Sequence, residues 1–513
     1  MALPLAASTD DGGGSWLGEV ESTINAVFDP ISAFTTSVIF YEVSIGAVTF
    51  PIIVAWLVIA GAIFTIYFKG VQVTGFPHAI ARVRGKYSRH DDPGEVTHFQ
   101  ALASALSGTV GLGNIAGVAV AVTLGGPGAT FWMILAGLLG MCTKFVECTL
   151  GQKYRTIHED GTVTGGPFKY LPVAFARFGG VTSKGLTGVF AIAIFLFGAV
   201  GGNMFQANQT FAQAREVTGG ADGPLGSEGS AFIFGLVMAV LVGAVILGGI
   251  KSIGAVTSRL VPAMAFVYVG ACLFVIFSNL GSVPDAFASI IDGAFSPDGI
   301  SGGVIGVLVI GFQRAAFSNE AGLGSAPTAH SAAKTRHPVS EGFVALLEPF
   351  VDTVIICTMT ALTIIIAAPP LYQESMERVQ AGGAEGDGVV LTSAAFETFI
   401  PQFPVILAIA VALFAFSTLI TWAYYTMKAW TTLFGRTPGT ELTFKVVYCV
   451  FTVVGTVLTL DTVLDFADSM LFLCAFVNLL ACYLLLPVVK AELQDYMAQR
   501  RSGEITEVEA EAR

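Results

Sequence analysis

Charged residues are scarce in this chain of 513 residues, and their scarcity excludes most soluble folds. Asp, Glu, Lys and Arg together make up 12% of the sequence, whereas 54% of the residues are hydrophobic and the mean hydropathy is +0.74. Soluble globular domains carry roughly twice that share of charged residues, about 25%. We therefore predict an all-α polytopic membrane protein.

Other absences narrow the function. No segment fits the P-loop pattern GxxxxGK[ST], which argues against an ATP-driven pump. The seven cysteines all fall within hydrophobic segments and suggest neither a disulfide framework nor a zinc site. The six histidines lie at or near predicted cytoplasmic loops without metal-ligand spacing, which disfavours a membrane enzyme. We expect no enzyme activity, no cofactor, and neither ATP nor nucleic acid as a partner.

The N-terminal region lacks the basic flank of a secretory signal. Residues 1–27 are polar, which predicts a short exposed tail. Residues 28–43 mix apolar side chains with Asp29 and Glu42, which favours a helix lying at the membrane interface. We assign 1–44 as an extracytoplasmic tail and interfacial segment.

Apolar runs of roughly 17 to 25 residues predict membrane-spanning helices. We expect eleven, at residues 45–67, 99–123, 128–150, 186–211, 231–249, 259–280, 302–326, 343–368, 403–427, 442–460 and 464–489.

Basic residues are divided unequally between alternate loops. If the first loop is cytoplasmic, 21 of the 25 Lys and Arg residues fall on the cytoplasmic side and only Arg215 and Arg378 fall on the other. The remaining two, Lys144 and Arg314, lie inside spans. This asymmetry predicts a multi-pass protein of the plasma (inner) membrane, with the N-terminus outside and the tail 490–513 in the cytoplasm.

A stretch of small and polar residues interrupts the second predicted span. It reads SALSGTVGLGNIAGVAVAVTLGGPG (104–128), and each glycine in a helix interior costs about 1 kcal/mol relative to alanine. Opened backbone is tolerated in lipid only where it is buried in protein or lines a cavity. The stretch is therefore either a broken helix at a binding site or a Gly-rich face that packs closely on another helix.

The seventh predicted span carries a similar interruption. V-G-L-G-N (110–114) is matched five spans later by A-G-L-G-S (321–325), although a shared G-L-G can arise by chance in a chain with 59 glycines. Because an odd number of crossings reverses the second unit, this spacing indicates an inverted repeat. We predict five-helix repeats at 99–281 and 302–489 with one discontinuous helix in each, and a peripheral first span with its loop at 45–98.

Six sequence blocks resemble the alanine or glycine:cation symporters, over about residues 99–489. They are S-G-T-V-G-L-G-N-I-A-G-V-A (107–119), L-G-G-P-G-A-T-F-W-M (124–133), G-M-C-T-K-F-V-E (140–147), T-G-G-P-F-K-Y-L (164–171), F-S-N-E-A-G-L-G-S-A-P-T-A-H (317–330) and L-E-P-F-V-D-T-V-I-I-C-T-M-T-A-L (347–362). The resemblance implies the fold of the bacterial leucine transporter and sodium-coupled uptake of alanine or glycine by alternating access. Leu112 departs from the family pattern, in which threonine is usual, and Phe168-Lys169 stand where Met-Tyr is usual.

An amino-acid zwitterion needs donors for its carboxylate, acceptors for its ammonium and a wall for its side chain. Amides opened at 111–113 would meet the carboxylate, because a helix N-terminus favours negative charge. Carbonyls freed at 317–319 would accept from the ammonium. Asn203 and Gln206 share a helix face and serve either the substrate or helix packing. The predicted substrate site comprises Thr109, Gly111, Leu112, Gly113, Asn203, Gln206, Phe317, Ser318, Asn319 and Trp422.

Sodium prefers hard oxygen ligands, which carbonyls and hydroxyls supply. Ser417 and Thr418 form a hydroxyl pair in the ninth span. Resemblance to the leucine transporter places this pair opposite the backbone of Ser107 and Val110; the alternative is that the hydroxyls only bond carbonyls one turn earlier. The predicted sodium ligands are Ser107, Val110, Phe414, Ser417 and Thr418.

Ionisable residues inside spans mark function or a partner. We assign gating or coupling to Asn114, Arg314 and Glu320, and expect Lys144 and Glu147, at i and i+3, to form an intrahelical pair. Glu348 and Asp352 share a helix face without an assigned role, so proton coupling stays open as an alternative to sodium. An ion channel is disfavoured, because no short pore motif is found. The expected partners are a small neutral amino acid, sodium and membrane lipid.

Overall fold

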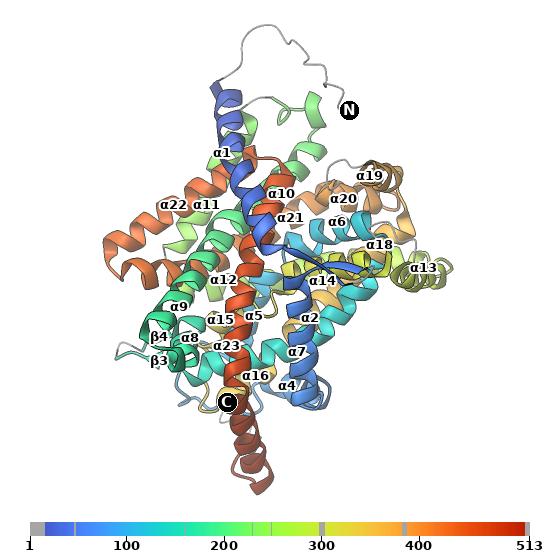
Figure 1. The fold of residues 1–513 in the computed structure, drawn as a ribbon. Coiled ribbons are helices and arrows are strands. Elements are labelled where there is room, and N and C mark those ends of the chain that lie inside the picture. Colours follow the sequence, from blue (N-terminus) through green and yellow to red (C-terminus); the bar gives the residue numbers. More distant parts are fainter. Residues whose placement is uncertain are drawn as a thin grey trace.

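In the part of the chain that the structure describes, helices make up nearly all of the fold and two short antiparallel hairpins complete it (Figure 1). The computed structural model describes residues 16–45, 48–159, 161–227, 229–247, 249–296, 303–381 and 387–507. The main hydrophobic core joins residues from both halves of the sequence, so the two halves form one packed body.

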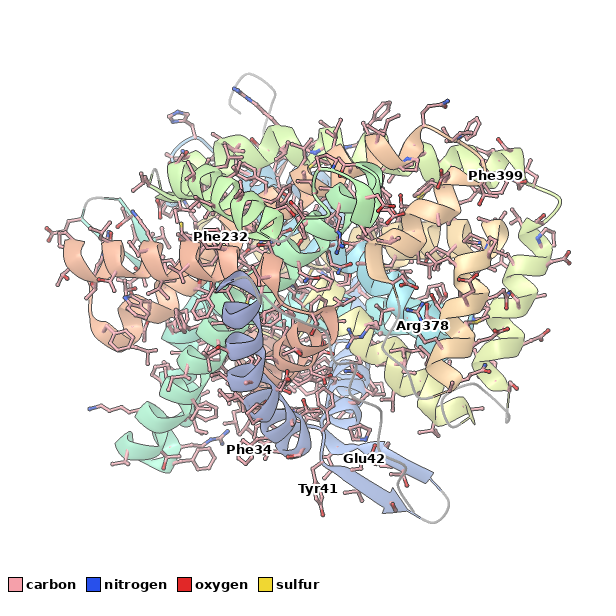
Figure 2. The ribbon with its side chains drawn as sticks, turned by 90° about the horizontal axis from the view of Figure 1, so that it is seen from above. Phe34, Tyr41, Glu42, Phe232, Arg378 and Phe399 are labelled. Carbon is pink, nitrogen blue, oxygen red and sulfur yellow. The ribbon has the colours of Figure 1, made fainter. Side chains whose placement is uncertain are left out.

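The N-terminal segment differs from the sequence prediction in two ways. Helix α1 (Trp16–Ile39) begins inside the segment predicted to be a polar tail, because Leu17, Val20 and Ile24 recur at helical spacing among the acidic residues. The chain then forms strands β1 (Glu42–Ile45) and β2 (Val48–Pro51) where the first span was expected to start. Figure 2 shows this hairpin, marked by Tyr41 and Glu42, at the edge of the molecule.

The first span is consequently shorter than predicted. Helix α2 (Ile52–Tyr67) supplies only 16 residues. Helices α3 (Val71–Thr74) and α4 (Phe76–Val83) follow it and lead into the second span.

The second span is broken where the sequence predicted. Helix α5 (His98–Thr109) ends two residues before Gly111, a short turn η1 (Leu112–Asn114) follows, and α6 (Ala116–Gly125) leaves at an angle of 57°. The rest of the first half contains α7 (Ala129–Lys153), β3 (Thr156–Ile157), β4 (Val163–Thr164), α8 (Pro167–Phe175), η2 (Ala176–Phe178), α9 (Gly180–Phe195), a π-helical segment η3 (Leu196–Gly201), α10 (Gly202–Val217), η4 (Gly220–Asp222), α11 (Ser230–Ile246), α12 (Gly249–Ser278) and α13 (Val283–Phe295).

The seventh span is also broken. Helix α14 (Gly303–Asn319) stops at the sequence E-A-G-L-G-S, and α15 (Ala326–His330) begins after it. Within the break, φ is +56° at Glu320, +93° at Gly322 and +81° at Gly324. Residues that carry a side chain rarely adopt this left-handed backbone conformation. Glycine adopts it without strain, and two of the three residues with positive φ in the break are glycine.

The second half continues with helices of varied length. They are α16 (Pro338–Ala345), α17 (Leu347–Pro349), a π-helical segment η5 (Phe350–Cys357), α18 (Thr358–Ala367), α19 (Pro370–Gln380), α20 (Gly388–Glu397), α21 (Phe403–Phe434), α22 (Pro438–Val457) and α23 (Leu460–Ser502).

The two broken helices run antiparallel at the centre of the molecule. The first half of one, α5, packs against the second half of the other, α15, while α6 packs against α14. This pairing, in which the first half of each helix contacts the second half of the other, requires the two helices to run in opposite directions. It also brings the two breaks together. Opposite directions are what an inverted repeat requires, and the repeat itself remains a prediction.

Seven helices or helix runs of the described part are long and apolar enough to cross a membrane, and the bent pair of α5 with η1–α6 makes an eighth. The other three predicted spans coincide with apolar helices α2, α11 and α14, which have 16 or 17 residues each. The structure therefore has the helices of a multi-pass membrane protein, and the count of eleven spans remains a prediction.

Candidate functional site

A small buried cavity lies between the two breaks. It has a volume of about 20 Å³ and is lined by Gly108, Thr109, Gly113, Phe197, Gly202, Gln206, Phe317, Glu320, Thr418 and Trp422. A volume of ~10–15 Å³ suffices for one water molecule. Any larger ligand must therefore displace the lining side chains.

Seven of the ten lining residues were predicted from the sequence. Thr109, Gly113, Gln206, Phe317 and Trp422 belong to the predicted substrate site, Thr418 to the predicted ion site, and Glu320 to the predicted gate. Gly108, Phe197 and Gly202 were not predicted.

Aromatic rings form one wall of the cavity. The ring of Phe197 meets Trp422 edge-on, with centroids 4.8 Å apart and an interplanar angle of 82°. Phe317 is edge-on to Phe205 at 5.1 Å and to Phe197 at 6.1 Å. These mutual contacts hold the rings around the cavity and leave room for only a small apolar group.

The carboxylate of Glu320 closes the cavity beside the second break. It accepts hydrogen bonds from Trp422 Nε1 at 2.9 Å and from Ser325 Oγ at 2.5 Å, and the side chain is buried. Glu320 thus joins the two ends of the break to α21.

The amide groups of the first break are partly used by side chains. Gly111 N donates to Asn114 Oδ1 at 2.9 Å, and Leu112 N lies 3.4 Å from Gln206 Oε1. Neither Gly111 nor Leu112 lines the cavity, whereas Gly113 does. Of the predicted carboxylate donors, Gly113 is the one that the structure places at the cavity.

Asn203 does not line the cavity. Its Nδ2 donates to the carbonyls of Tyr448 at 2.8 Å and Ala199 at 3.1 Å, and Thr452 Oγ1 donates to its Oδ1 at 2.9 Å. The packing alternative therefore describes Asn203, which joins α10 to α22. We withdraw it as a substrate contact.

Asp352 connects the two breaks. Its Oδ1 accepts from Asn114 Nδ2 at 2.7 Å, and its Oδ2 accepts from Ser318 Oγ and Thr353 Oγ1 at 2.8 Å. Asn114 Nδ2 also lies 3.0 Å from Ser318 Oγ. Asp352, to which no role was assigned from the sequence, is therefore the carboxylate that fixes one break against the other.

Ser318 and Asn319 direct their side chains towards η5 rather than the cavity. Asn319 Nδ2 donates to Thr353 Oγ1 at 2.9 Å, while Asn319 Oδ1 accepts from Ala321 N at 2.9 Å. The predicted role of these residues used their backbone carbonyls, and the side-chain contacts fix that backbone at the end of α14.

The predicted sodium ligands lie where α21 crosses the end of α5. Thr418 Oγ1 donates to the carbonyl of Ser107 at 3.0 Å, and Ser107 Oγ donates to the carbonyl of Ser417 at 2.9 Å. Ser417 Oγ bonds the carbonyl of Phe414, three residues earlier, at 2.9 Å. Val110 is the buried C-cap residue that directly follows α5. The structure thus brings hydroxyl and carbonyl oxygens together at this crossing. The alternative, that a hydroxyl only bonds a carbonyl one turn earlier in its own helix, describes Ser417 but not Thr418.

Lys144 and Glu147 do not form the predicted intrahelical pair. Lys144 Nζ lies 3.0 Å from Glu348 Oε1, and both side chains are fully buried. Glu147 instead accepts from Gly324 N at 3.1 Å and from Asn478 Nδ2 at 2.8 Å. The carboxylate of Glu147 satisfies amides that the second break exposes, and this leaves Lys144 for the neighbouring helix.

Arg314 pairs with Asp468 of α23. Gln313 Nε2 donates to the same carboxylate oxygen at 2.8 Å, and the Arg314 guanidinium lies 5.7 Å from the ring centroid of Phe317. The ion pair is buried. It therefore covers the aromatic wall of the cavity six residues before the second break, which begins at Glu320.

Two histidines belong to a buried polar chain. Glu341 is bonded to His98 and, at 2.7 Å, to His330 Nδ1, whose Nε2 lies 3.7 Å from Glu348. This chain ties the start of α5 to α15 and α16. Across the residues that the structure describes, no group of three or more His, Cys, Asp or Glu is arranged to hold a metal ion.

Two antiparallel broken helices around a small, polar and aromatic cavity define a helical membrane transporter. The family model of the sodium:alanine symporter family matches residues 35–510, so the chain belongs to that family. The sodium/alanine symporter AgcS of Methanococcus maripaludis is 36% identical over 457 residues, 88% of this chain and 95% of that protein. The amino-acid carrier protein AlsT of Bacillus subtilis is 34% identical and the match covers 86% of this chain and 89% of AlsT.

A solved structure supports the expected fold. The crystal structure of MhsT in complex with L-phenylalanine aligns with a TM-score of 0.54 and 15% sequence identity, covering 75% of this chain and 89% of that chain. At this identity the likeness concerns the fold alone. The relatives are transporters, and this chain is accordingly a symporter-family membrane protein and not an enzyme.

Proposed function

We propose that this protein couples the entry of sodium to the uptake of alanine or glycine by alternating access. The observation that carries the proposal is the lining of the cavity between the two broken helices, because it combines opened backbone, the polar side chains of Thr109 and Gln206, and aromatic rings, which suits a small zwitterion. The name of the relative AgcS, a sodium/alanine symporter, agrees with this choice.

The substrate would lie along the two breaks. The amide of Gly113 and the side chain of Gln206 would receive the carboxylate, and the carbonyls at the end of α14 would receive the ammonium. Phe317 and Trp422 would limit the side chain, because their rings already contact Phe197. A methyl group or hydrogen would fit there with small shifts of the rings.

Uptake of labelled amino acid into proteoliposomes tests this function. We expect alanine uptake to require an inward sodium gradient and to be inhibited by unlabelled glycine but not by phenylalanine. Choline in place of sodium, with and without an inward proton gradient, is the control. Alanine uptake driven by protons in the absence of sodium would show that the proton-coupled alternative is correct.

The oxygen cluster at the crossing of α5 and α21 is the proposed sodium site. Thr418→Ala should raise the sodium concentration for half-maximal uptake about tenfold, because it removes one of five or six oxygen ligands; tenfold corresponds to ~1.4 kcal/mol. Thr418→Ser keeps the hydroxyl and should stay near the wild-type value. Equal sodium dependence in Thr418→Ala and wild type would place the ion elsewhere.

The ion pair of Arg314 with Asp468 is the proposed outer gate. The predicted orientation places the start of α14 and of α23 outside, so the pair lies between the cavity and the exterior. Arg314→Gln should weaken alanine binding at least tenfold, because the closed form of the gate loses its ion pair. Arg314→Lys keeps the charge but loses the forked geometry, and should give an intermediate value. Wild-type affinity in Arg314→Gln, measured by calorimetry with sodium present, would contradict a gating role.

A further inference from the structure

A basic cavity lies at one end of α11, α21 and α22, apart from the central cavity. Its volume is about 550 Å³, and its charged lining comprises Lys428, Arg436, Lys445, Glu95 and Glu441. It is therefore far larger than the cavity between the breaks and has a different chemistry.

The two carboxylates of this cavity are engaged by other groups. Glu441 Oε1 lies 3.2 Å from Arg436 Nε, and Glu95 Oε1 accepts from Val163 N at 2.5 Å. Within the described ranges no carboxylate lies within 4.0 Å of the ammonium of Lys428 or Lys445. The ammonium of Lys428 lies 5.1 Å from the centroid of the Tyr424 ring, a contact with a ring face and not with a carboxylate. Both lysines therefore remain able to bind an external anion.

An apolar groove runs along the outer surface between α11 and α22, which pack side by side (Figure 1). Its volume is about 340 Å³, and its lining includes Leu236, Ala239, Gly243, Cys449 and Val450. Small residues form the floor: a Cβ at Gly243 would have only Cys449 Sγ, at 3.5 Å, within 4 Å. Leu236 and Val450 at its edges are 50% and 53% exposed.

The groove leads into the basic cavity, because Leu247 and Lys445 line both. From Leu236 to Leu247 the groove follows α11 for about 16 Å at 1.5 Å per residue. This length matches one leaflet of the hydrocarbon core, which is about 15 Å, half of the ~30 Å total. An apolar groove of leaflet length that ends at two lysines without a carboxylate partner in the described residues matches an anionic lipid in both shape and charge.

We propose that the α11–α22 groove with the basic cavity is a binding site for one anionic phospholipid. An acyl chain lies over Ala239 and Gly243, and the phosphate lies between Lys428 and Lys445. Basic pockets between membrane helices on the cytoplasmic side favour anionic headgroups. The predicted orientation places this end of the helices in the cytoplasmic leaflet. The site does not depend on which solute the protein transports.

Native mass spectrometry of the purified protein tests the site with dioleoylphosphatidylglycerol and dioleoylphosphatidylcholine as probes. We expect the wild type to retain phosphatidylglycerol at least tenfold more tightly than phosphatidylcholine. Lys428→Gln with Lys445→Gln should remove most of this preference, because each lysine near the surface contributes about fivefold. Lys184→Gln, an exposed lysine on α9, is the matched control and should leave the preference unchanged.

The groove is tested separately. Gly243→Leu fills its floor and should weaken retention of both lipids, whereas it leaves the two lysines in place. A melting temperature within a few degrees of the wild type verifies that each variant is folded. Equal retention of the two lipids by the wild type, or an unchanged preference in the double lysine variant, would overturn the proposal.

Discussion

Lys144→Met should leave little folded protein in the membrane. The substitution removes the ammonium that lies 3.0 Å from Glu348 Oε1, and both side chains are fully buried. Loss of one partner of a buried ion pair typically costs about 3–5 kcal/mol, because the other charge loses its counter-ion. Glu348 would keep only His330 Nε2, at 3.7 Å. Since the whole free energy of unfolding of a protein is about 5–15 kcal/mol, the yield and the melting temperature should both fall sharply.

Two controls distinguish the effect of leaving a buried charge without its partner from the effect of removing a lysine side chain. Lys144→Met combined with Glu348→Gln removes both charges and should recover most of the stability. Lys153, on the same helix α7 as Lys144, forms an ion pair with Glu492 of α23, but the Lys153 side chain is 41% exposed. Lys153→Met breaks this exposed pair. Exposed pairs contribute ~0–1 kcal/mol, so this variant should melt close to the wild type. Equal melting temperatures of Lys144→Met and Lys153→Met would show that the buried pair does not stabilise the fold.

The prediction that Lys144 pairs with Glu147 was wrong, because helical spacing does not show which groups on neighbouring helices compete for each side chain. Lys144 and Glu147 stand at i and i+3, a spacing that favours a pair on an isolated helix. In the fold, Glu147 faces the second break and bonds the amide of Gly324. Bonds to amides exposed by a break depend on which helix lies opposite, and a single sequence does not specify that neighbour.

The breaks themselves could be predicted because they depend on local chemistry. Glycine at 111, 113, 322 and 324 weakens the helix in both spans, and α5 and α14 end two and three residues before the first glycine of each pair. The start of the first span could not be predicted from hydropathy, since strands β1 and β2 carry apolar residues such as Val43, Ile45 and Phe50 that a membrane helix also carries. Hydropathy measures the preference for lipid or protein interior, but does not distinguish a strand from a helix.

Phe197 could not be predicted for a geometric reason, which its spacing from Gly202 shows. They lie five residues apart, a spacing that puts two side chains on different faces of an α-helix. The π-helical segment η3 joins them, and its wider turn brings both to the central cavity. Gly202 lies four residues before Gln206 on α10, one turn away on the same helix face. Ordinary helical spacing from Gln206 therefore predicts Gly202.

Gly111→Ala should impair sodium-dependent uptake as strongly as Thr418→Ala. A Cβ at Gly111 would lie 2.6 Å from Thr418 Oγ1, closer than carbon and oxygen atoms approach without a shift. The Thr418 hydroxyl must then leave the carbonyl of Ser107, to which it donates at 3.0 Å. We expect the sodium concentration for half-maximal alanine uptake to rise about tenfold or more, measured in proteoliposomes. Gly117→Ala, where a Cβ would meet nothing within 4 Å, is the matched control and should transport normally.

The double variant tests whether Gly111 acts through Thr418. Thr418→Ala removes the oxygen with which the new Cβ would clash, so the second substitution should add little to the first. Substitutions at contacting residues give such non-additive effects, whereas independent sites give the sum of the two free-energy changes. Gln206 Nε2, 3.3 Å from the same Cβ position, is a side chain that can shift to accommodate it. If the two effects instead multiply, the role of Gly111 would lie in the backbone of the break and not in the position of the Thr418 hydroxyl.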